Sequence, residues 1–97
     1  MEKKLYFNDL YDYYQDLFTE KQKSYFESYY FDDLSLSEIA ENDGVSRNAV
    51  HHQLKIVEEK LIEYEQKLKL YEKRQKVVEL LSRLQDEQLK NEILEVV

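Results

Sequence analysis

The stretch from Leu36 to Leu54, LSEIAENDGVSRNAVHHQL, decides the fold. Ser35 and Glu38 at its start have the spacing of a capping box, in which each side chain satisfies a free backbone N–H of the other residue. Gly44 is the only glycine in the chain, and glycine often ends a helix because it adopts left-handed backbone angles without steric cost. Ser46 then has the position of a cap for a second helix. The stretch therefore predicts a helix, a tight turn and another helix.

Small and apolar side chains in this stretch have the positions needed to join two steeply crossed helices. Ala40 is small enough to let the helices approach each other. Four residues are predicted to fill the wedge between them: Ile39, Val45, Val50 and Leu54. Asp43 stands where such motifs often carry an apolar residue, so we expect it at the surface. The arrangement is a helix-turn-helix, a motif that places its second helix in the major groove of DNA.

The start of the second helix supplies the candidate DNA contacts, because this part of the motif meets base edges and phosphates. The predicted contact residues are Ser46, Arg47, Asn48, His51, His52 and Lys55. Arg47 can pair with guanine and Asn48 with adenine, whereas Ser46 and Lys55 can reach phosphates. In the alternative interpretation, Ser46 only caps the helix and Arg47 is a solvated surface charge.

The adjacent histidines His51 and His52 do not predict a metal site. Neighbouring helix positions point about 100° apart, and zinc ligands on helices are spaced by three or four residues. The chain has no cysteine and no glycine-rich phosphate loop, and its acids are scattered without a paired histidine. We therefore expect a protein without metal or cofactor that is not an enzyme.

Aromatic residues at helical spacing predict two further helices before the motif. The first stripe, between Leu5 and Leu17, consists of Tyr6, Leu10, Tyr13, Tyr14 and Leu17. Thr19 and Gln22 form another capping box, and a second stripe follows it with Tyr25, Phe26, Tyr29 and Tyr30. Stacking on nucleic-acid bases requires interleaved Lys or Arg, but the flanks here are acidic. We interpret both stripes as core, packed as an antiparallel hairpin.

A heptad stripe continues beyond the motif and predicts a long fourth helix from Arg47 to about Tyr71. The stripe contains Val50, Leu54, Val57, Leu61, Tyr64, Leu68 and Tyr71. Residues 72–97 predict an apolar C-terminal helix, which either folds back or crosses to a second copy. We expect an all-α chain with a head at residues 1–71 and an interface or pack-back segment at 72–97. The predicted homodimer interface comprises Val57, Leu61, Tyr64, Leu68, Leu81 and Leu84.

The charge distribution bears on the partner. The net charge of −7 weakens non-specific attraction to phosphate. Yet residues 67–76, KLKLYEKRQK, hold five bases and one acid. The simplest interpretation is a solvated connection between helices. The alternative is that Lys67, Lys69, Lys73, Arg74 and Lys76 contact phosphates of DNA or of a structured RNA.

The stretch from about Phe7 to Tyr71, which contains NDLYDYYQDLF and SLSEIAENDGVSRNAVHHQL, resembles the YlxM family of small helix-turn-helix proteins. Its motif core, LSEIAENDGVSRNAV, also resembles region 4 of bacterial sigma factors. The sigma recognition helix is rich in Arg, whereas His51 and His52 stand in part of that stretch here. The resemblance implies a sigma-region-4-like fold. It also implies an association with the signal recognition particle pathway, inferred for the family from gene neighbourhood.

Two functions follow as hypotheses. One is a dimeric regulator that binds double-stranded DNA. The other is an adaptor that binds the protein or the RNA of the signal recognition particle without reading DNA. The polar residues after Ser46 favour the regulator, and the acidic charge balance favours the adaptor. Because no apolar run is long enough to span a membrane, we expect a cytoplasmic protein without membrane insertion.

Overall fold

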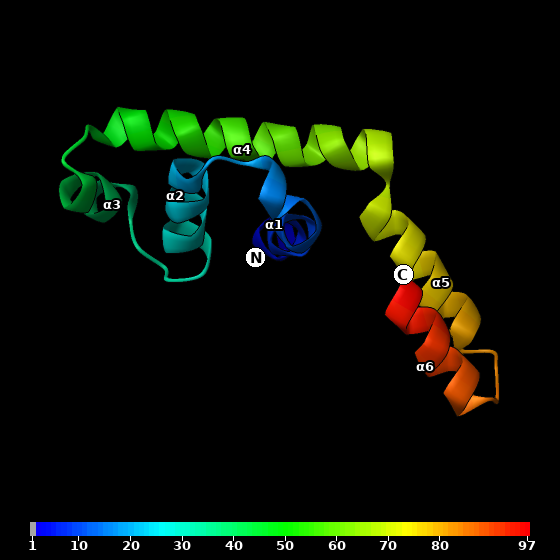
Figure 1. Cartoon of the computed structure of the whole chain (residues 1–97). Coiled ribbons are helices and arrows are strands. Elements are labelled where there is room, and N and C mark those ends of the chain that lie inside the picture. Colours follow the sequence, from blue (N-terminus) through cyan, green and yellow to red (C-terminus); the bar gives the residue numbers. More distant parts are fainter. Residues whose placement is uncertain (1) are drawn as a thin grey trace.

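All regular elements of the chain are helices in the computed structural model, which describes residues 2–97. They are α1 (Glu2–Tyr14), the 3₁₀ turn η1 (Gln15–Leu17), α2 (Glu20–Tyr30), α3 (Leu36–Asp43), α4 (Arg47–Leu68), α5 (Leu70–Leu81) and α6 (Glu87–Val96). The predicted all-α fold class is confirmed. The molecule extends over 54 × 25 × 23 Å, with α1, α2 and α3 packed along α4 and with α5 and α6 beyond one end of α4 (Figure 1).

Helices α2 and α3 begin where the sequence predicts, because both capping boxes form. The backbone N–H of Gln22 donates to the Thr19 hydroxyl at 3.1 Å, and the Thr19 N–H donates to the Gln22 side chain at 3.1 Å. Ser35 and Glu38 make the same reciprocal pair, also at 3.1 Å in both directions. Each pair satisfies two backbone donors that the helix itself leaves free.

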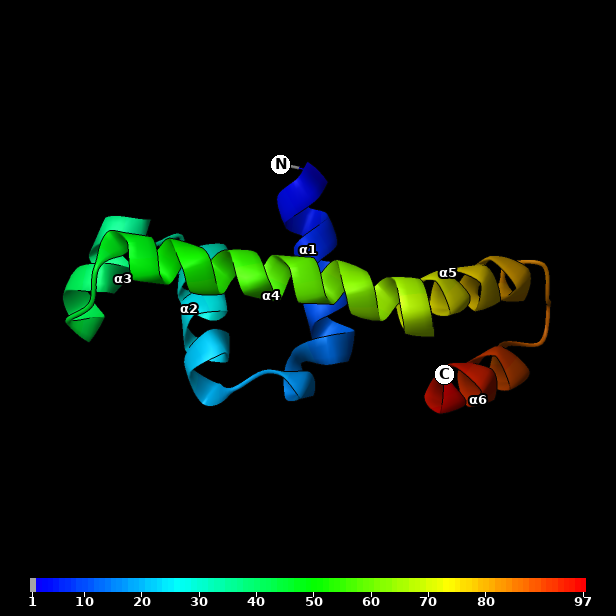
Figure 2. The same cartoon turned by 90° about the horizontal axis from the view of Figure 1, so that it is seen from above.

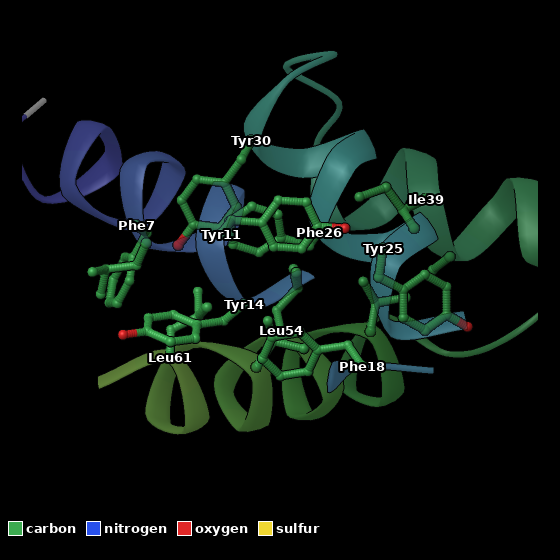
Figure 3. Close-up of a cluster of buried hydrophobic side chains, with 14 residues drawn as sticks. Phe7, Tyr11, Tyr14, Phe18, Tyr25, Phe26, Tyr30, Ile39, Leu54 and Leu61 are labelled. Atoms are coloured by element: carbon green, nitrogen blue, oxygen red, sulfur yellow. The ribbon is translucent and has the colours of Figure 1, made fainter. Parts of the chain in front are cut away.

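Aromatic side chains form most of the core between α1, α2 and α4. Helices α1 and α2 run in opposite directions (Figure 2), and the rings of Tyr11 and Phe26 stack between them with centroids 4.2 Å apart. The core consists of Phe7, Leu10, Tyr11, Tyr14, Phe18, Tyr25, Phe26, Tyr30, Ile39, Ala40, Val50, Leu54, Val57 and Leu61 (Figure 3). The interpretation of the aromatic stripes as core is confirmed for the second stripe and, in the first, for Leu10, Tyr13 and Tyr14.

The buried face of α1 is rotated from the one predicted. Tyr6 and Leu17 are exposed, and the buried residues are Phe7, Leu10, Tyr11, Tyr14 and, after the helix, Phe18. The two sets both have helical spacing, so periodicity alone does not choose between them. The α-helix ends at Tyr14 and a 3₁₀ turn follows, which removes Leu17 from the stripe. Tyr6 packs instead edge-on against Tyr71, with ring centroids 5.8 Å apart.

The fourth helix is shorter than predicted. It ends at Leu68 rather than near Tyr71, because Lys69 adopts the left-handed conformation, with φ 55° and ψ 33°. A non-glycine residue in that region interrupts a right-handed helix. The chain then resumes as α5 in a new direction (Figure 1), so Lys69 forms an elbow between α4 and α5.

A buried polar cluster stabilises this elbow. The carboxylate of Glu65 accepts hydrogen bonds from the Tyr14 hydroxyl at 2.6 Å and from the backbone N–H groups of Tyr71 and Glu72 at 3.1 and 3.0 Å. The Tyr14 oxygen in turn accepts from the N–H of Leu70 at 3.1 Å. The first N–H groups of α5, which have no partner within their helix, are thus satisfied by side chains of α4 and α1.

The C-terminal segment consists of two helices rather than the one predicted. Helix α6 is capped by Asp86, whose carboxylate accepts a hydrogen bond from the N–H of Leu89 at 3.0 Å. The helix lies alongside α5 (Figures 1 and 2). Leu81 is the only buried residue of α5, and α6 has none. The segment therefore folds back on itself and not onto α4. We call α5 and α6 together the C-terminal hairpin.

Candidate nucleic-acid interface

The turn between α3 and α4 has the geometry that the motif requires. Gly44 has φ 66° and ψ 35°, in the left-handed region. The N–H of Val45 donates to the carbonyl of Ala40 at 3.0 Å, and the N–H of Gly44 donates to that of Glu41 at 3.4 Å. This pair of bonds is a Schellman motif, which ends a helix and satisfies its last carbonyls. The predicted role of Gly44 is confirmed.

The start of α4 is fixed against α3 in the predicted way. The hydroxyl of Ser46 accepts from the N–H of Ala49 at 3.0 Å and so caps the helix. The wedge between α3 and α4 contains Ile39, Val50 and Leu54, which are buried, and Val45, which is partly buried. Asp43 is exposed at the surface, as predicted. The two helices therefore form a helix-turn-helix.

The six predicted DNA-contact residues are all exposed: Ser46, Arg47, Asn48, His51, His52 and Lys55. Five of them lie on α4, where their positions span an arc of about 140° at 100° per residue. The arc faces away from the buried side of the helix, which carries Val50 and Leu54. We call these six residues the recognition face.

The recognition face keeps its positive charge. Among the ion pairs formed by residues 2–97, none involves Arg47 or Lys55. Glu58, the next acid along α4, accepts a hydrogen bond from the Tyr30 hydroxyl of α2. This contact directs the carboxylate towards the core, and burial together with the bond to Glu58 raises the pKa of Tyr30. Arg47 and Lys55 therefore meet solvent without a neutralising partner.

Two grooves flank the recognition face. One, of about 230 Å³, is lined by Tyr29, Leu36, His51, Leu54, Lys55 and Glu58. The other, of about 490 Å³, is lined by Thr19, Lys21, Gln22, Tyr25, Val45, Ala49, His52 and Gln53. Lys21 thus lies on the same groove as His52, with its ammonium 5.8 Å from the Tyr25 ring centre. Sequence reasoning missed Lys21, because only the packing of α2 against α4 brings it there.

The second set of predicted phosphate contacts lies at the other end of α4. Lys67, Lys69, Lys73 and Lys76 are exposed and Arg74 is partly exposed. Lys67 pairs with Glu63 at 3.0 Å, and the hydrogen bonds from Lys67 and Lys60 lower the pKa of the Glu63 carboxyl. These cations surround the elbow and the first turns of α5, and they do not join the recognition face.

The predicted dimer residues differ in their burial. Val57 and Leu61 are fully buried in the core of their own chain. Tyr64 is partly buried against the same core, and Leu81 is buried in the C-terminal hairpin. Leu68 and Leu84 are exposed. Helices α1 and α2 thus cover most of the heptad stripe on α4, and the covered part is not accessible to a second chain.

The fold and the exposed recognition face define a protein of the helix-turn-helix class. Residues 1–96 match the model of a family described as "Putative helix-turn-helix protein, YlxM / p13 like", and the chain belongs to this family. A UPF0122 protein of Bacillus cereus (strain AH187) is 47% identical over 102 residues, which cover 100% of this chain and 93% of the relative.

Two further relatives agree with this assignment. The UPF0122 protein of Halalkalibacterium halodurans is 46% identical over 86 residues, covering 89% of this chain and 79% of its own. The UPF0122 protein of Geobacillus sp. (strain WCH70) is 49% identical over 86 residues, which cover 89% of this chain and 78% of the relative. Within residues 2–97, no helix is both long enough and apolar enough to cross a membrane.

Proposed function

We propose that this protein binds double-stranded DNA through the recognition face and acts as a regulator. The observation that carries the proposal is the exposed arc at the start of α4, in which Arg47 and Lys55 have no ion-pair partner among residues 2–97. In a helix-turn-helix, this part of the second helix enters the major groove. Membership of a helix-turn-helix family supports binding to nucleic acid.

The side chains of the recognition face are suited to different parts of the DNA. Arg47 has the donors for a bidentate contact with guanine, and Asn48 has the donor and acceptor that adenine requires. Lys55 and the hydroxyl of Ser46 can contact phosphates, and Lys21 of α2, on the flanking groove, can contact a further phosphate. Lys55 and Lys21, the two cations assigned to phosphates, predict a modest salt dependence, with a slope of log affinity on log salt of roughly −2 for each protomer.

Selection of bound sequences from a random duplex DNA pool at physiological salt tests this proposal. We expect a defined sequence to be enriched by the wild type and by Arg83→Ala, a matched loss of an exposed arginine in the turn after α5. Arg47→Ala should lose the enrichment, with affinity for the selected site lower by roughly 10- to 100-fold, the cost of one specific base contact. Absence of any enrichment by the wild type would overturn DNA reading.

A second candidate function is the adaptor of the signal recognition particle pathway. The net charge of −7 favours a protein partner over DNA. The cations around the elbow favour a structured RNA, which is recognised largely through its backbone and shape. Binding of the particle's protein subunit and RNA, measured separately, tests it. The double change Arg47→Ala with Lys55→Ala should spare a protein contact and abolish DNA binding. Both functions are binding functions in the cytoplasm, and we assign no catalytic step to either.

A further inference from the structure

The C-terminal hairpin is the least covered part of the molecule. Its exposed large apolar residues are 37% to 82% exposed: Leu70, Val78, Leu80, Leu84, Leu89, Val96 and Val97. Helix α5 has 12 residues and α6 has 10, and helices of this length are marginal in water unless an apolar face is buried. With Leu81 as its one buried residue, the hairpin needs a further surface to pack against.

The charges of the hairpin indicate which surface that is. Lys73, Arg74 and Lys76 lie on α5, where they outnumber its two acids, whereas α6 carries three acids and one base. The ion pairs here, Arg83 with Glu79 and Lys90 with Glu87, each join residues three or four apart in sequence. None of the ion pairs of residues 2–97 connects α5 with α6. Helix α5 thus has a small excess of positive charge and α6 an excess of negative charge, and among residues 2–97 no ion pair involves the three bases of α5 or Glu92 and Glu95 of α6.

We propose that the C-terminal hairpin pairs with the same hairpin of a second copy about a two-fold axis. In such a pairing, α5 of each copy lies against α6 of the other, so one self-complementary surface satisfies both charge patterns at once. The exposed apolar residues become the core of a four-helix bundle. This goes beyond DNA binding and stands independently of it. It also leaves the recognition face free, since the hairpin lies beyond the opposite end of α4 (Figure 1).

The oligomeric state of the full chain is the first test, measured by sedimentation equilibrium. We expect a dimer with a Kd of about 10 μM or tighter, and a Kd at least about 100-fold weaker for Leu80→Glu. Leu80 is 59% exposed, so the change should leave the helix content unchanged by circular dichroism. Leu5→Glu on α1, at a residue 61% exposed, is the matched control and should remain dimeric. A monomeric wild type, or a dimer lost equally in both variants, overturns the proposal.

Charge exchange between copies tests the pairing of the helices. One chain carries Lys73→Glu and Arg74→Glu, and the other carries Glu92→Lys and Glu95→Lys. Each alone places like charges across the two-fold axis and should be monomeric, whereas their mixture should form a heterodimer. If the charges act only within one hairpin, mixing restores nothing. A wild-type dimer together with two monomeric variants that do not associate would therefore overturn this pairing.

Discussion

The head, α1 to α4, and the C-terminal hairpin contain similar patterns of apolar residues but use them differently. In the head, α1, α2 and α3 all pack against α4, and fourteen side chains of the described residues form one core. In the hairpin, Leu81 is the one buried residue, and Tyr71, Val77, Ile93 and Leu94 are partly buried. The head is therefore stable through its own contacts, whereas the hairpin depends on a surface outside the chain. Helical periodicity is the same in both regions and does not separate them.

The largest expected effect contrasts one core residue of the head with one apolar residue of the hairpin. Phe26 is fully buried, and its ring stacks on those of Tyr11 and Tyr30 at 4.2 and 4.3 Å between centroids. Phe26→Ala should lower the free energy of unfolding by about 3–5 kcal/mol. Leu80→Ala should change it by less than about 0.5 kcal/mol in dilute protein, where the chain is monomeric. Urea denaturation followed by circular dichroism measures both. Comparable losses would show that the hairpin is packed as tightly as the head.

The elbow joins the two regions, and the Glu65 cluster is the next target. Glu65→Ala leaves the Tyr14 hydroxyl and the N–H groups of Tyr71 and Glu72 without their acceptor. We expect a loss of about 1–3 kcal/mol in the free energy of unfolding, the usual cost of unsatisfied buried groups. Amide hydrogen exchange in the first turn of α5 should also accelerate.

Glu63→Ala is the matched control, because Glu63 is a solvent-accessible glutamate on the same helix, and its ion pairs among residues 2–97 are those with Lys60 and Lys67. Exposed ion pairs contribute little to stability, so this variant should unfold and exchange like the wild type. If both glutamates behave alike, the elbow is not held by the Glu65 carboxylate.

Those parts of the fold that follow from short-range chemistry were predictable. The two capping boxes, the Gly44 turn and the exposed arc after Ser46 each depend on residues a few positions apart. The break at Lys69 was not predictable in this way, because the heptad stripe passes through it without interruption. What stabilises it is the hydrogen bond between Tyr14 and Glu65, which are 51 positions apart. Lys21 could not be predicted for the same reason, because only tertiary packing brings it to the groove beside the recognition face.

The predicted interface shows a second limit of the sequence. An apolar stripe that includes Val57 and Leu61 indicates that a helix buries one face. It does not indicate whether that face packs against the same chain or against a second one. Here α1 and α2 take up that face, since their aromatic side chains fill the space beside α4. Only the residues left exposed after folding, such as Leu68 and Leu84, remain available to another molecule.

Alkaline pH should distinguish the head from the hairpin. Burial and the hydrogen bond to Glu65 raise the pKa of Tyr14 to about 12, and burial also raises the pKa of Tyr11 and Tyr30. Tyrosine in an unfolded chain titrates near pH 10. The stability due to these neutral tyrosines is therefore complete below about pH 10 and falls as the pH rises through about 12, because the unfolded state releases its protons first.

Urea denaturation at a series of pH values, with tyrosinate absorbance recorded in parallel, measures this fall. Tyr14→Phe removes one of the raised hydroxyls, so its stability should decline less steeply between pH 10 and 12 than that of the wild type. An identical pH profile in both proteins would mean that Tyr14 ionises as freely in the folded head as in the unfolded chain.

The smallest effects compare two left-handed residues, Gly44 in the head and Lys69 at the elbow. Gly44→Ala should lower the free energy of unfolding by about 1 kcal/mol, because alanine is strained in the left-handed conformation. No steric clash adds to this cost, since no atom lies within 4 Å of the added Cβ. Lys69→Gly relieves a similar strain but also gives the unfolded chain more freedom, so the two contributions nearly cancel. Thermal unfolding of both variants gives the difference. A clear stabilisation by Lys69→Gly would mean that the Glu65 cluster imposes the elbow against the preference of Lys69, whereas a loss would mean that the side chain of Lys69 itself supports it.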